Sequence, residues 1–299
     1  MSAIVHYTEC PVCGSKQINP LLTVKDHTVS KENFVIWQCS NCTVRFTQDV
    51  PNADSIGAYY KSENYISHTN TDKGIVNKLY KKVRNYTLEG KADLIIKSTG
   101  VEKGNVLDVG CGVGAYLNVM QQRGWKINGL EPDENARKLA KELFHINAEE
   151  PSQLFQLADN SFDAITMWHV LEHVHDLHGN MEQLKEVLKE KGKLFIAVPN
   201  YFSLDADIYR LNWAAYDVPR HLYHFTPKSI EILVQQHGMK LANKKPMWFD
   251  SFYISMLSSK YKNGKTSYIG SFINGLRSNI KALANKDQSS SLIYIIEKI

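Results

Sequence analysis

The stretch that most constrains the fold is GNVLDVGCGVGAYLNVMQQRG, residues 104–124. It predicts a short buried strand over residues 106–109, a tight turn of three glycines, and a helix that ends at Gly124. The segment WKINGLEP predicts a second strand, and Glu131 follows at its end. A strand, a glycine loop, a helix and a strand ending in an acid form the nucleotide-binding half of a doubly wound fold. Glycines let the backbone approach a ligand closely, and the acid can accept hydrogen bonds from both ribose hydroxyls.

Asp108 indicates which ligand the glycine loop holds. The letters GCGVGA also fit a loose G-x-G-x-x-A dinucleotide pattern, which is weak when it stands alone. Asp108 lies two residues before the first glycine, where a carboxylate would repel the pyrophosphate of a dinucleotide. S-adenosylmethionine has no phosphate and carries a sulfonium and an ammonium group. A carboxylate at this position therefore favours S-adenosylmethionine over a dinucleotide.

At these residues the sequence resembles the class I S-adenosylmethionine-dependent methyltransferases. VLDVGCGVG is similar to the first motif of that superfamily and GLEP to the second. LADNSFDAITMWHVLEHVHDL, KLFIAVPN and LIYIIEKI are similar to its fourth, fifth and last strands. WAAYDVPRHLYHFTPKSI resembles the MetW/UbiG-like branch (types 11, 12 and 23), some members of which carry an N-terminal four-cysteine zinc segment. The resemblance implies an α/β fold with a doubly wound, Rossmann-like, mostly parallel seven-stranded sheet.

The resemblance also implies a set of cofactor-binding residues. Asp108 and the glycines would line the methionine end of S-adenosylmethionine, and Glu131 would hold the ribose. Glu149 is a looser match for the acid on the adenine side. Tyr65 and His68 belong to AYYKSENYISH, a stretch that is similar to one closing over the cofactor in this branch. The expected cofactor-binding residues are Asp108, Gly110, Cys111, Gly112, Glu131, Pro132, Glu149, Trp168, His169, Tyr65 and His68.

Four of the five cysteines form two CxxC pairs with 25 residues between them. Two such knuckles supply four thiolates, which suits tetrahedral Zn²⁺ in a structural site. The alternative is a redox dithiol, but a redox CxxC usually opens a helix, whereas Pro11 and Gly14 suit a knuckle turn. The expected zinc ligands are Cys10, Cys13, Cys39 and Cys42.

The segment DVPRHLYHFT, residues 217–226, concentrates groups that transfer protons and bind anions. It follows the predicted fifth strand, and ligands of open parallel sheets bind beyond the carboxyl ends of the strands. A histidine there can take a proton from the methyl acceptor, and an arginine can hold an anionic group of it. The alternative is structural: Arg220 pairs with Asp217, and the histidines bond backbone carbonyls. The catalytic candidates are His221 as first choice of base, then His224, with Arg220 and Tyr223.

A zinc-peptidase signature, H-x-x-E-H, occurs at residues 169–173. That chemistry needs the motif inside a helix, whereas here it directly follows a predicted strand. We therefore expect no catalytic metal from this motif, and we expect capping or packing roles for His173, His175 and His178.

The chain has 299 residues, of which 43% are hydrophobic and 22% charged, with a net charge of +4. We expect a zinc-binding segment over residues 1–50, a linker and helical lead-in over 51–90, and a cofactor-binding domain over 91–299. Insertions are expected at about 201–225 and 250–288, and the second would be helical over 266–284. No apolar run is long enough to span a membrane, and the N-terminus lacks a signal-peptide pattern. We therefore expect a cytoplasmic protein.

The leading hypothesis is a methyltransferase that acts on a small molecule, such as a sugar or other metabolite, and releases S-adenosylhomocysteine. An RNA methyltransferase that uses the zinc segment to bind RNA is the first alternative. The low net charge and the sequence MWHV, where amino-directed enzymes place [DNS]-P-P-[YFW], disfavour it. A non-catalytic, zinc-containing interaction protein is the second alternative. We expect neither a nucleic acid nor a membrane as partner.

Overall fold

The computed structural model describes residues 4–60 and 75–299. Two predicted cofactor contacts, Tyr65 and His68, lie outside these residues. Within the described chain, no helix is both long and apolar enough to cross a membrane.

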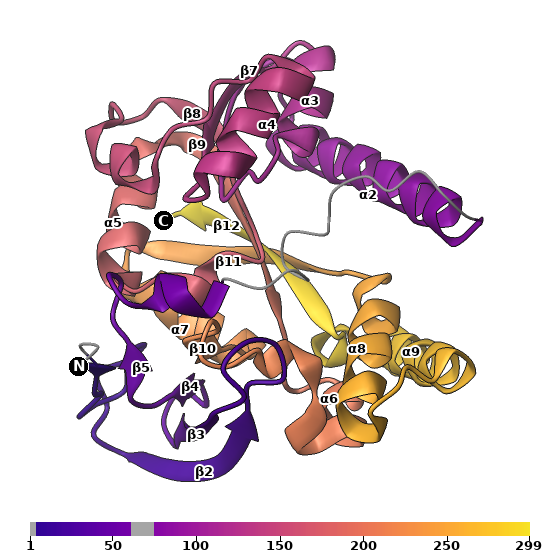
Figure 1. The fold of residues 1–299 in the computed structure, drawn as a ribbon. Helices are drawn as coiled ribbons and strands as arrows, with labels where there is room; N and C mark the ends of the chain where they lie inside the picture. Colours follow the sequence, from indigo (N-terminus) through magenta and orange to yellow (C-terminus); the bar gives the residue numbers. More distant parts are fainter. Residues whose placement is uncertain (1–3, 61–74) are drawn as a thin grey trace.

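A six-stranded sheet forms the centre of the described chain (Figure 1). Four neighbouring strands are parallel, and the strand β12 runs antiparallel both to β9 and to β11. In spatial order the strands are β11 (Met239–Pro246), β12 (Ser291–Lys298), β9 (Leu188–Pro199), β8 (Phe162–Trp168), β6 (Asn105–Val109) and β7 (Lys126–Leu130).

The predicted seventh strand is reduced to a single bridge between Leu130 and Glu149. Pro151 follows two residues later and begins a 3-10 turn over Pro151–Gln156. Proline cannot donate to a strand ladder, so pairing beside β7 stops there. The outer edge of the parallel half is therefore shorter than the resemblance implied.

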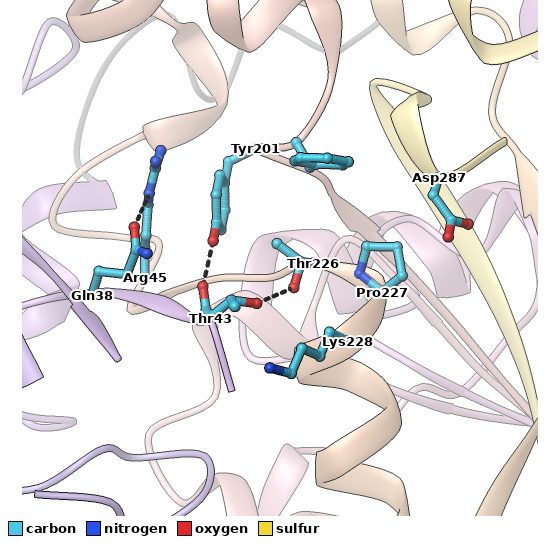
Figure 2. Close-up of a pocket in the computed structure, with 9 residues that line it drawn as sticks. Gln38, Thr43, Arg45, Tyr201, Thr226, Pro227, Lys228 and Asp287 are labelled. Carbon is cyan, nitrogen blue, oxygen red and sulfur yellow. Dashed lines mark hydrogen bonds between the residues drawn. The ribbon is translucent and has the colours of Figure 1, made fainter. Parts of the chain in front are cut away.

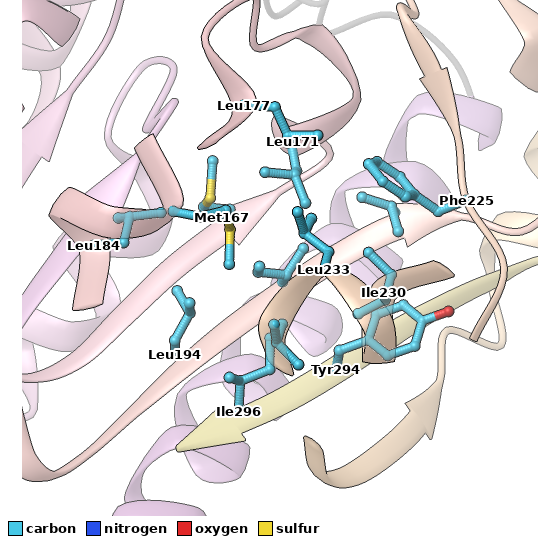
Figure 3. Packing of buried hydrophobic residues seen from close by; sticks show 14 of the residues in the cluster. Met167, Leu171, Leu177, Leu184, Leu194, Phe225, Ile230, Leu233, Tyr294 and Ile296 are labelled. Atoms are coloured by element: carbon cyan, nitrogen blue, oxygen red, sulfur yellow. The ribbon is translucent and has the colours of Figure 1, made fainter. Parts of the chain in front are cut away.

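Helices cover both faces of the sheet, as a doubly wound fold requires. One face packs against α5 and α7 (Figure 3), and the other packs against α2, α3 and α4. Thr226 caps α7 and Pro227 is its first residue, as the sequence predicted. The helices are α2 (Ile75–Thr99), α3 (Ala115–Gln122), α4 (Glu134–Phe144), α5 (Leu177–Val187), α6 (Leu204–Tyr209), α7 (Pro227–Gln236), α8 (Asp250–Asn263) and α9 (Tyr268–Ala284).

The cysteine-containing segment forms a second sheet, to which the 217–226 segment contributes a strand. The spatial order is β10, β4, β3, β2, and Tyr223 pairs with Phe46 in antiparallel register. Buried residues of this segment belong to the same hydrophobic cluster as β8, β9 and α7. The N-terminal strands are β1 (Ile4–Val5), β2 (Ile18–Lys25), β3 (Asn33–Cys39), β4 (Arg45–Thr47) and β5 (Val50–Pro51), and β10 is Tyr223–His224.

Candidate functional site

The glycine loop leaves the carboxyl end of β6 and turns back toward β7. The N–H groups of Gly110 and Cys111 both donate to the carbonyl of Leu130, at 2.7 and 3.0 Å. Gly110 has a φ of +74°, and a Cβ placed on it would lie 2.4 Å from Cγ2 of Val170. This position therefore requires glycine for both conformation and space. Gly112 has a φ of +55°, and a Cβ placed on it would have no atom within 4 Å apart from those of its chain neighbours.

Glu131 lies at the end of β7 and faces the glycine loop. One carboxylate oxygen accepts the N–H of Gly112 at 2.8 Å, and the other accepts the N–H of Asp133 at 2.9 Å. Burial raises the pKa of Glu131, although these two backbone donors oppose the shift. The carboxylate is thus positioned across the loop, where the resemblance placed the ribose hydroxyls.

Asp108 is buried at the base of the loop, only 2% exposed. Its Oδ1 accepts a 2.6 Å hydrogen bond from Thr166 on the neighbouring strand β8. Burial raises the pKa of Asp108 to about 7, against the opposing effects of Thr166 and Lys91. A cation placed beside a buried carboxylate with a raised pKa stabilises its ionised form, because the cation compensates for the hydration lost on burial.

The surroundings of Asp108 contain polar groups that lack partners. The hydroxyl of Tyr116 and the indole N–H of Trp168 are buried, with no hydrogen bond within the described residues. Their rings meet edge to face, and the ammonium of Lys91 lies 4.2 Å above the Trp168 ring. Unpaired buried donors beside an acid and a glycine loop fit a polar ligand such as S-adenosylmethionine. Lys91 and Thr166 were not predicted, because Lys91 lies outside the matched motifs and the fourth-strand motif by itself does not show that Thr166 meets Asp108.

The remaining expected cofactor residues occupy different environments. Cys111 is buried against Gly129, and burial raises the pKa of its thiol. Pro132 is exposed beside α4, and the side chain of Glu149 is exposed while its backbone pairs with Glu131. Their contacts with a cofactor stay predictions.

His169 follows β8 and lies between two acids. Its Nε2 is 3.0 Å from Asp250, the first residue of α8, and its Nδ1 is 3.5 Å from Glu172. Burial lowers the pKa of His169, but the two carboxylates outweigh it and raise the pKa to about 10. His169 is therefore an imidazolium that joins α8 to the end of β8. Asp250 was not predicted, because only the fold brings it to this strand.

Glu172, His173 and His221 form a cluster whose ligand atoms all lie within 4.8 Å of one another, with Glu172 and His221 buried and His173 partly exposed. Both oxygens of Glu172 lack a hydrogen bond within the described residues, so the His169 contact is an ion pair only. His221 Nδ1 donates to the carbonyl of Ala215 at 2.8 Å, which leaves its Nε2 as a proton acceptor. One carboxylate and two imidazoles can also hold a divalent cation.

Arg220 is 1% exposed and binds groups of this chain on all sides. It donates to Asp217 at 2.9 and 2.6 Å, to Asp26 at 3.0 Å, and to the carbonyl of Tyr59 at 2.9 Å. This geometry favours the structural alternative, in which the arginine holds the loop. A contact with the acceptor would require Arg220 to give up these partners.

His224 and Tyr223 also point into the junction with the N-terminal sheet. His224 is buried, its Nε2 lies 3.3 Å from the hydroxyl of Thr47, and its ring packs against Tyr216. Burial lowers the pKa of His224 well below its usual value. The hydroxyl of Tyr223 donates to the carbonyl of His175 at 3.3 Å. Of the four catalytic candidates, His221 is the one whose side chain belongs to the Glu172 cluster.

The four predicted zinc ligands come together in the N-terminal sheet. The sulfurs of Cys10 and Cys42 lie 3.5 Å apart, and those of Cys13 and Cys39 lie 3.6 Å apart. All four sulfurs lie within 4.8 Å of one another. Tetrahedral Zn²⁺ with Zn–S bonds of about 2.3 Å needs sulfurs roughly 3.8 Å apart, so the set fits the ion. Zinc here would stabilise the two knuckles and leave no open position for chemistry.

The H-x-x-E-H motif does not form a peptidase helix. His169 follows a strand, and residues 171–173 form a single 3-10 turn. The later histidines attach the N-terminal segment: His175 contacts the carbonyl of Pro51 at 3.0 Å, and His178 contacts that of Pro11 at 3.1 Å. These are the structural roles that the sequence predicted for them.

A pocket of about 410 Å³ lies between the N-terminal sheet and the segment after β9 (Figure 2). The Tyr201 hydroxyl donates to the carbonyl of Thr43, and the Arg45 guanidinium lies 3.9 Å from the centre of the Tyr201 ring. The pocket is separate from the cofactor side, because neither the glycine loop nor the Glu172 cluster lines it. Its lining residues are Gln38, Thr43, Arg45, Tyr201, Phe202, Thr226, Pro227, Lys228 and Asp287.

Known proteins resemble this chain over the part that contains the glycine loop. A family model described as a methyltransferase domain matches residues 80–243. The ubiquinone biosynthesis O-methyltransferase of Glaesserella parasuis is 33% identical over 115 residues, which are 35% of this chain and 49% of that protein. The protein of the same name from Azoarcus is 24% identical over 173 residues, covering 54% of this chain and 74% of that one. The chain spans about half the length of the first curated relatives that it matches.

A solved structure has a similar fold. Magnesium protoporphyrin IX methyltransferase from Synechocystis superposes with a TM-score of 0.53 at 13% identity. The match covers 83% of this chain and 100% of that one. At this identity the likeness concerns the fold alone.

Proposed function

The chain belongs to the methyltransferase family whose domain model spans residues 80–243, and from this we propose that it methylates a small molecule with S-adenosylmethionine. The observation that carries the proposal is the buried carboxylate of Asp108 beneath a glycine loop that Glu131 spans. A cationic nucleoside fits this arrangement, whereas the phosphates of a dinucleotide would make ionisation of this buried acid still more costly.

The residues present suit each part of the cofactor. Asp108 would face the sulfonium and ammonium end, and Glu131 would accept hydrogen bonds from the ribose. S-adenosylmethionine supplies an electrophilic methyl group when bound. The chain itself holds the loop through the Leu130 carbonyl and positions His169 between Asp250 and Glu172. Methyl transfer is an in-line displacement, so this positioning supplies much of the rate.

On the acceptor side, we propose His221 as the base. Its Nδ1–H is held by the Ala215 carbonyl, so Nε2 can take the proton that the acceptor loses. The carboxylate of Glu172 adjoins the imidazole and would offset its new positive charge. The relatives named for O-methylation favour a hydroxyl group as acceptor. The zinc segment supports this site indirectly, because Thr47 donates to the carbonyl of His221 at 2.7 Å.

The test combines cofactor binding with transfer of labelled methyl groups. Calorimetry should show one S-adenosylmethionine bound per chain, and label should pass to members of a panel of phenols, catechols and sugars. His221→Ala should lower kcat on a responsive acceptor about 10²–10⁴-fold and leave the cofactor affinity unchanged. His145→Ala, at an exposed histidine after α4, is the matched control.

Two results would contradict the proposal that His221 is the base. Unchanged turnover in His221→Ala would remove His221 from the chemistry. Turnover that needs an added divalent metal and stops with chelator would instead assign Glu172, His173 and His221 to a cation.

A further inference from the structure

Helix α9 turns its apolar side chains away from the protein. Tyr268 is 72% exposed, Ile269 79%, Phe272 60% and Leu283 72%. Most helices of water-soluble domains place such residues against the core. The outward apolar face of α9 consists of Tyr268, Ile269, Phe272, Ile273, Leu276, Ile280 and Leu283.

The inner side of α9 explains this orientation, because small residues let it pack closely on α8 and α6. A Cβ on Gly275 would lie 2.6 Å from the Phe252 ring. Ser271 donates to the carbonyl of Ser255 at 3.0 Å, and Ser278 donates to the buried Asp205 at 2.7 Å. The helix is therefore fixed by small and polar groups, and rotating it would bury the large apolar residues only by breaking these hydrogen bonds.

The charge along the chain in this segment is one-sided. Residues 251–286 contain six Lys and Arg residues and no Asp or Glu. Outside this segment, the remaining 29 Lys and Arg residues are outnumbered by 31 Asp and Glu residues. The α8–α9 pair thus carries the positive charge of an otherwise slightly acidic chain. The cations are Lys260, Lys262, Lys265, Arg277, Lys281 and Lys286.

Two of these cations adjoin the apolar face. Arg277 and Lys281 line a shallow depression of about 310 Å³ together with Ile280, Leu204 and Ala284. Figure 1 shows α9 at the outer edge of the molecule, beyond α8 and on the side away from the N-terminal sheet. An apolar helix face with a basic rim at the edge of a protein is the pattern of a helix that lies in a bilayer interface.

We propose that the outward face of α9 docks on an anionic membrane surface. Apolar side chains would enter the acyl boundary, and Arg277 and Lys281 beside them would meet the lipid phosphates. Pairing with a second copy is disfavoured, because it would bring two faces of the same charge together. The expectation of no membrane partner rested on the lack of an apolar run long enough to cross a membrane. That criterion does not test for a helix that lies on the membrane surface. The proposal goes beyond methyl transfer and does not depend on it.

The test is sedimentation of the 299-residue chain with vesicles. The probes are phosphatidylcholine vesicles and phosphatidylcholine–phosphatidylglycerol vesicles. Wild type should bind the anionic vesicles, and raised salt should weaken this binding. Phe272→Ser with Ile280→Ser should lower the partition coefficient about tenfold or more. Arg277→Glu with Lys281→Glu should lower it by a similar factor on anionic vesicles only.

The matched control is Leu143→Ser with Phe155→Ser, which removes two apolar residues that are 50% and 51% exposed elsewhere. It should bind vesicles as wild type does. Circular dichroism and S-adenosylmethionine binding, measured without vesicles, should show that each variant is folded. Equal vesicle binding by all variants would overturn the proposal. So would a wild-type dimer that ignores vesicles and becomes monomeric in Phe272→Ser with Ile280→Ser.

Discussion

The glycine loop and the 217–226 segment are held over very different distances along the chain. Gly112 and Glu131, which are joined by a hydrogen bond, are 19 positions apart. Arg220 and Asp26 are 194 positions apart, and Thr47 and His221 are 174 apart. The proposed cofactor side is thus a local strand–loop–helix unit, whereas the proposed acceptor side is held by hydrogen bonds to the N-terminal segment. Damage to the docking should therefore separate acceptor chemistry from cofactor binding.

The largest expected effect comes from breaking this docking with Arg220→Met. The change leaves Asp217 and Asp26 as unpaired acids, one of them fully buried, so we expect a loss of about 3–5 kcal/mol in the free energy of unfolding. Urea unfolding measures it, and Arg210→Met, at an exposed arginine, is the control. A raised KM with unchanged stability would instead make Arg220 an acceptor anchor.

A smaller effect is expected within the glycine loop, where two glycines can be compared. Gly110→Ala combines a left-handed φ with a clash against Val170, so we expect a loss of about 2–4 kcal/mol and weakened S-adenosylmethionine binding. Gly112→Ala meets only the strain of its φ and should lose about 1–2 kcal/mol. Thermal unfolding and calorimetry measure both. Equal losses would show that Val170 moves aside.

The smallest expected effect is the pH dependence of cofactor binding. Because burial raises the pKa of Asp108 to about 7, its carboxylate is protonated below that pH and loses its attraction for a cation. Affinity for S-adenosylmethionine should be about tenfold weaker at pH 6 than at pH 8. In Asp108→Asn the affinity should be low and independent of pH across this range.

The same group makes an opposite prediction for stability. An aspartate of the unfolded chain ionises near pH 3.9, well below the folded-state value, so the folded state holds its proton over the interval. The free energy of unfolding of wild type relative to Asp108→Asn should therefore fall as pH rises from about 4 to about 7. A flat difference would mean that Asp108 ionises at its usual pH.

The sequence predicted the elements that follow local rules. The strand before Gly110, the helix after it, and the cap of α7 at Thr226 appear where patterning and capping residues placed them. The two CxxC pairs converge, because the antiparallel pairing of β2 with β3 places Ile18 opposite Cys39. The seventh strand was the exception, since one proline ended its pairing.

The candidate site was predicted unevenly. The glycine loop, Asp108 and Glu131 could be placed from the sequence because they belong to one strand–loop–helix–strand unit. Lys91 and Asp250 were missed because only helix packing brings them to Trp168 and His169. Arg220, Tyr223 and His224 were catalytic candidates in the sequence, but in the structure each of them contacts a residue in or beside the N-terminal sheet.

The sequence by itself determined the fold class, the glycine loop with Asp108 and Glu131, and the four cysteines that come together. These features depend on backbone conformation and spacing within short segments, which residue types encode directly. Only the tertiary structure decided that Arg220 forms an ion pair with Asp26, that His221 lies beside Glu172, and that α9 turns its apolar face outward. These contacts depend on which segments, far apart in the sequence, pack together. The role of a side chain then depends on the groups that this packing places beside it.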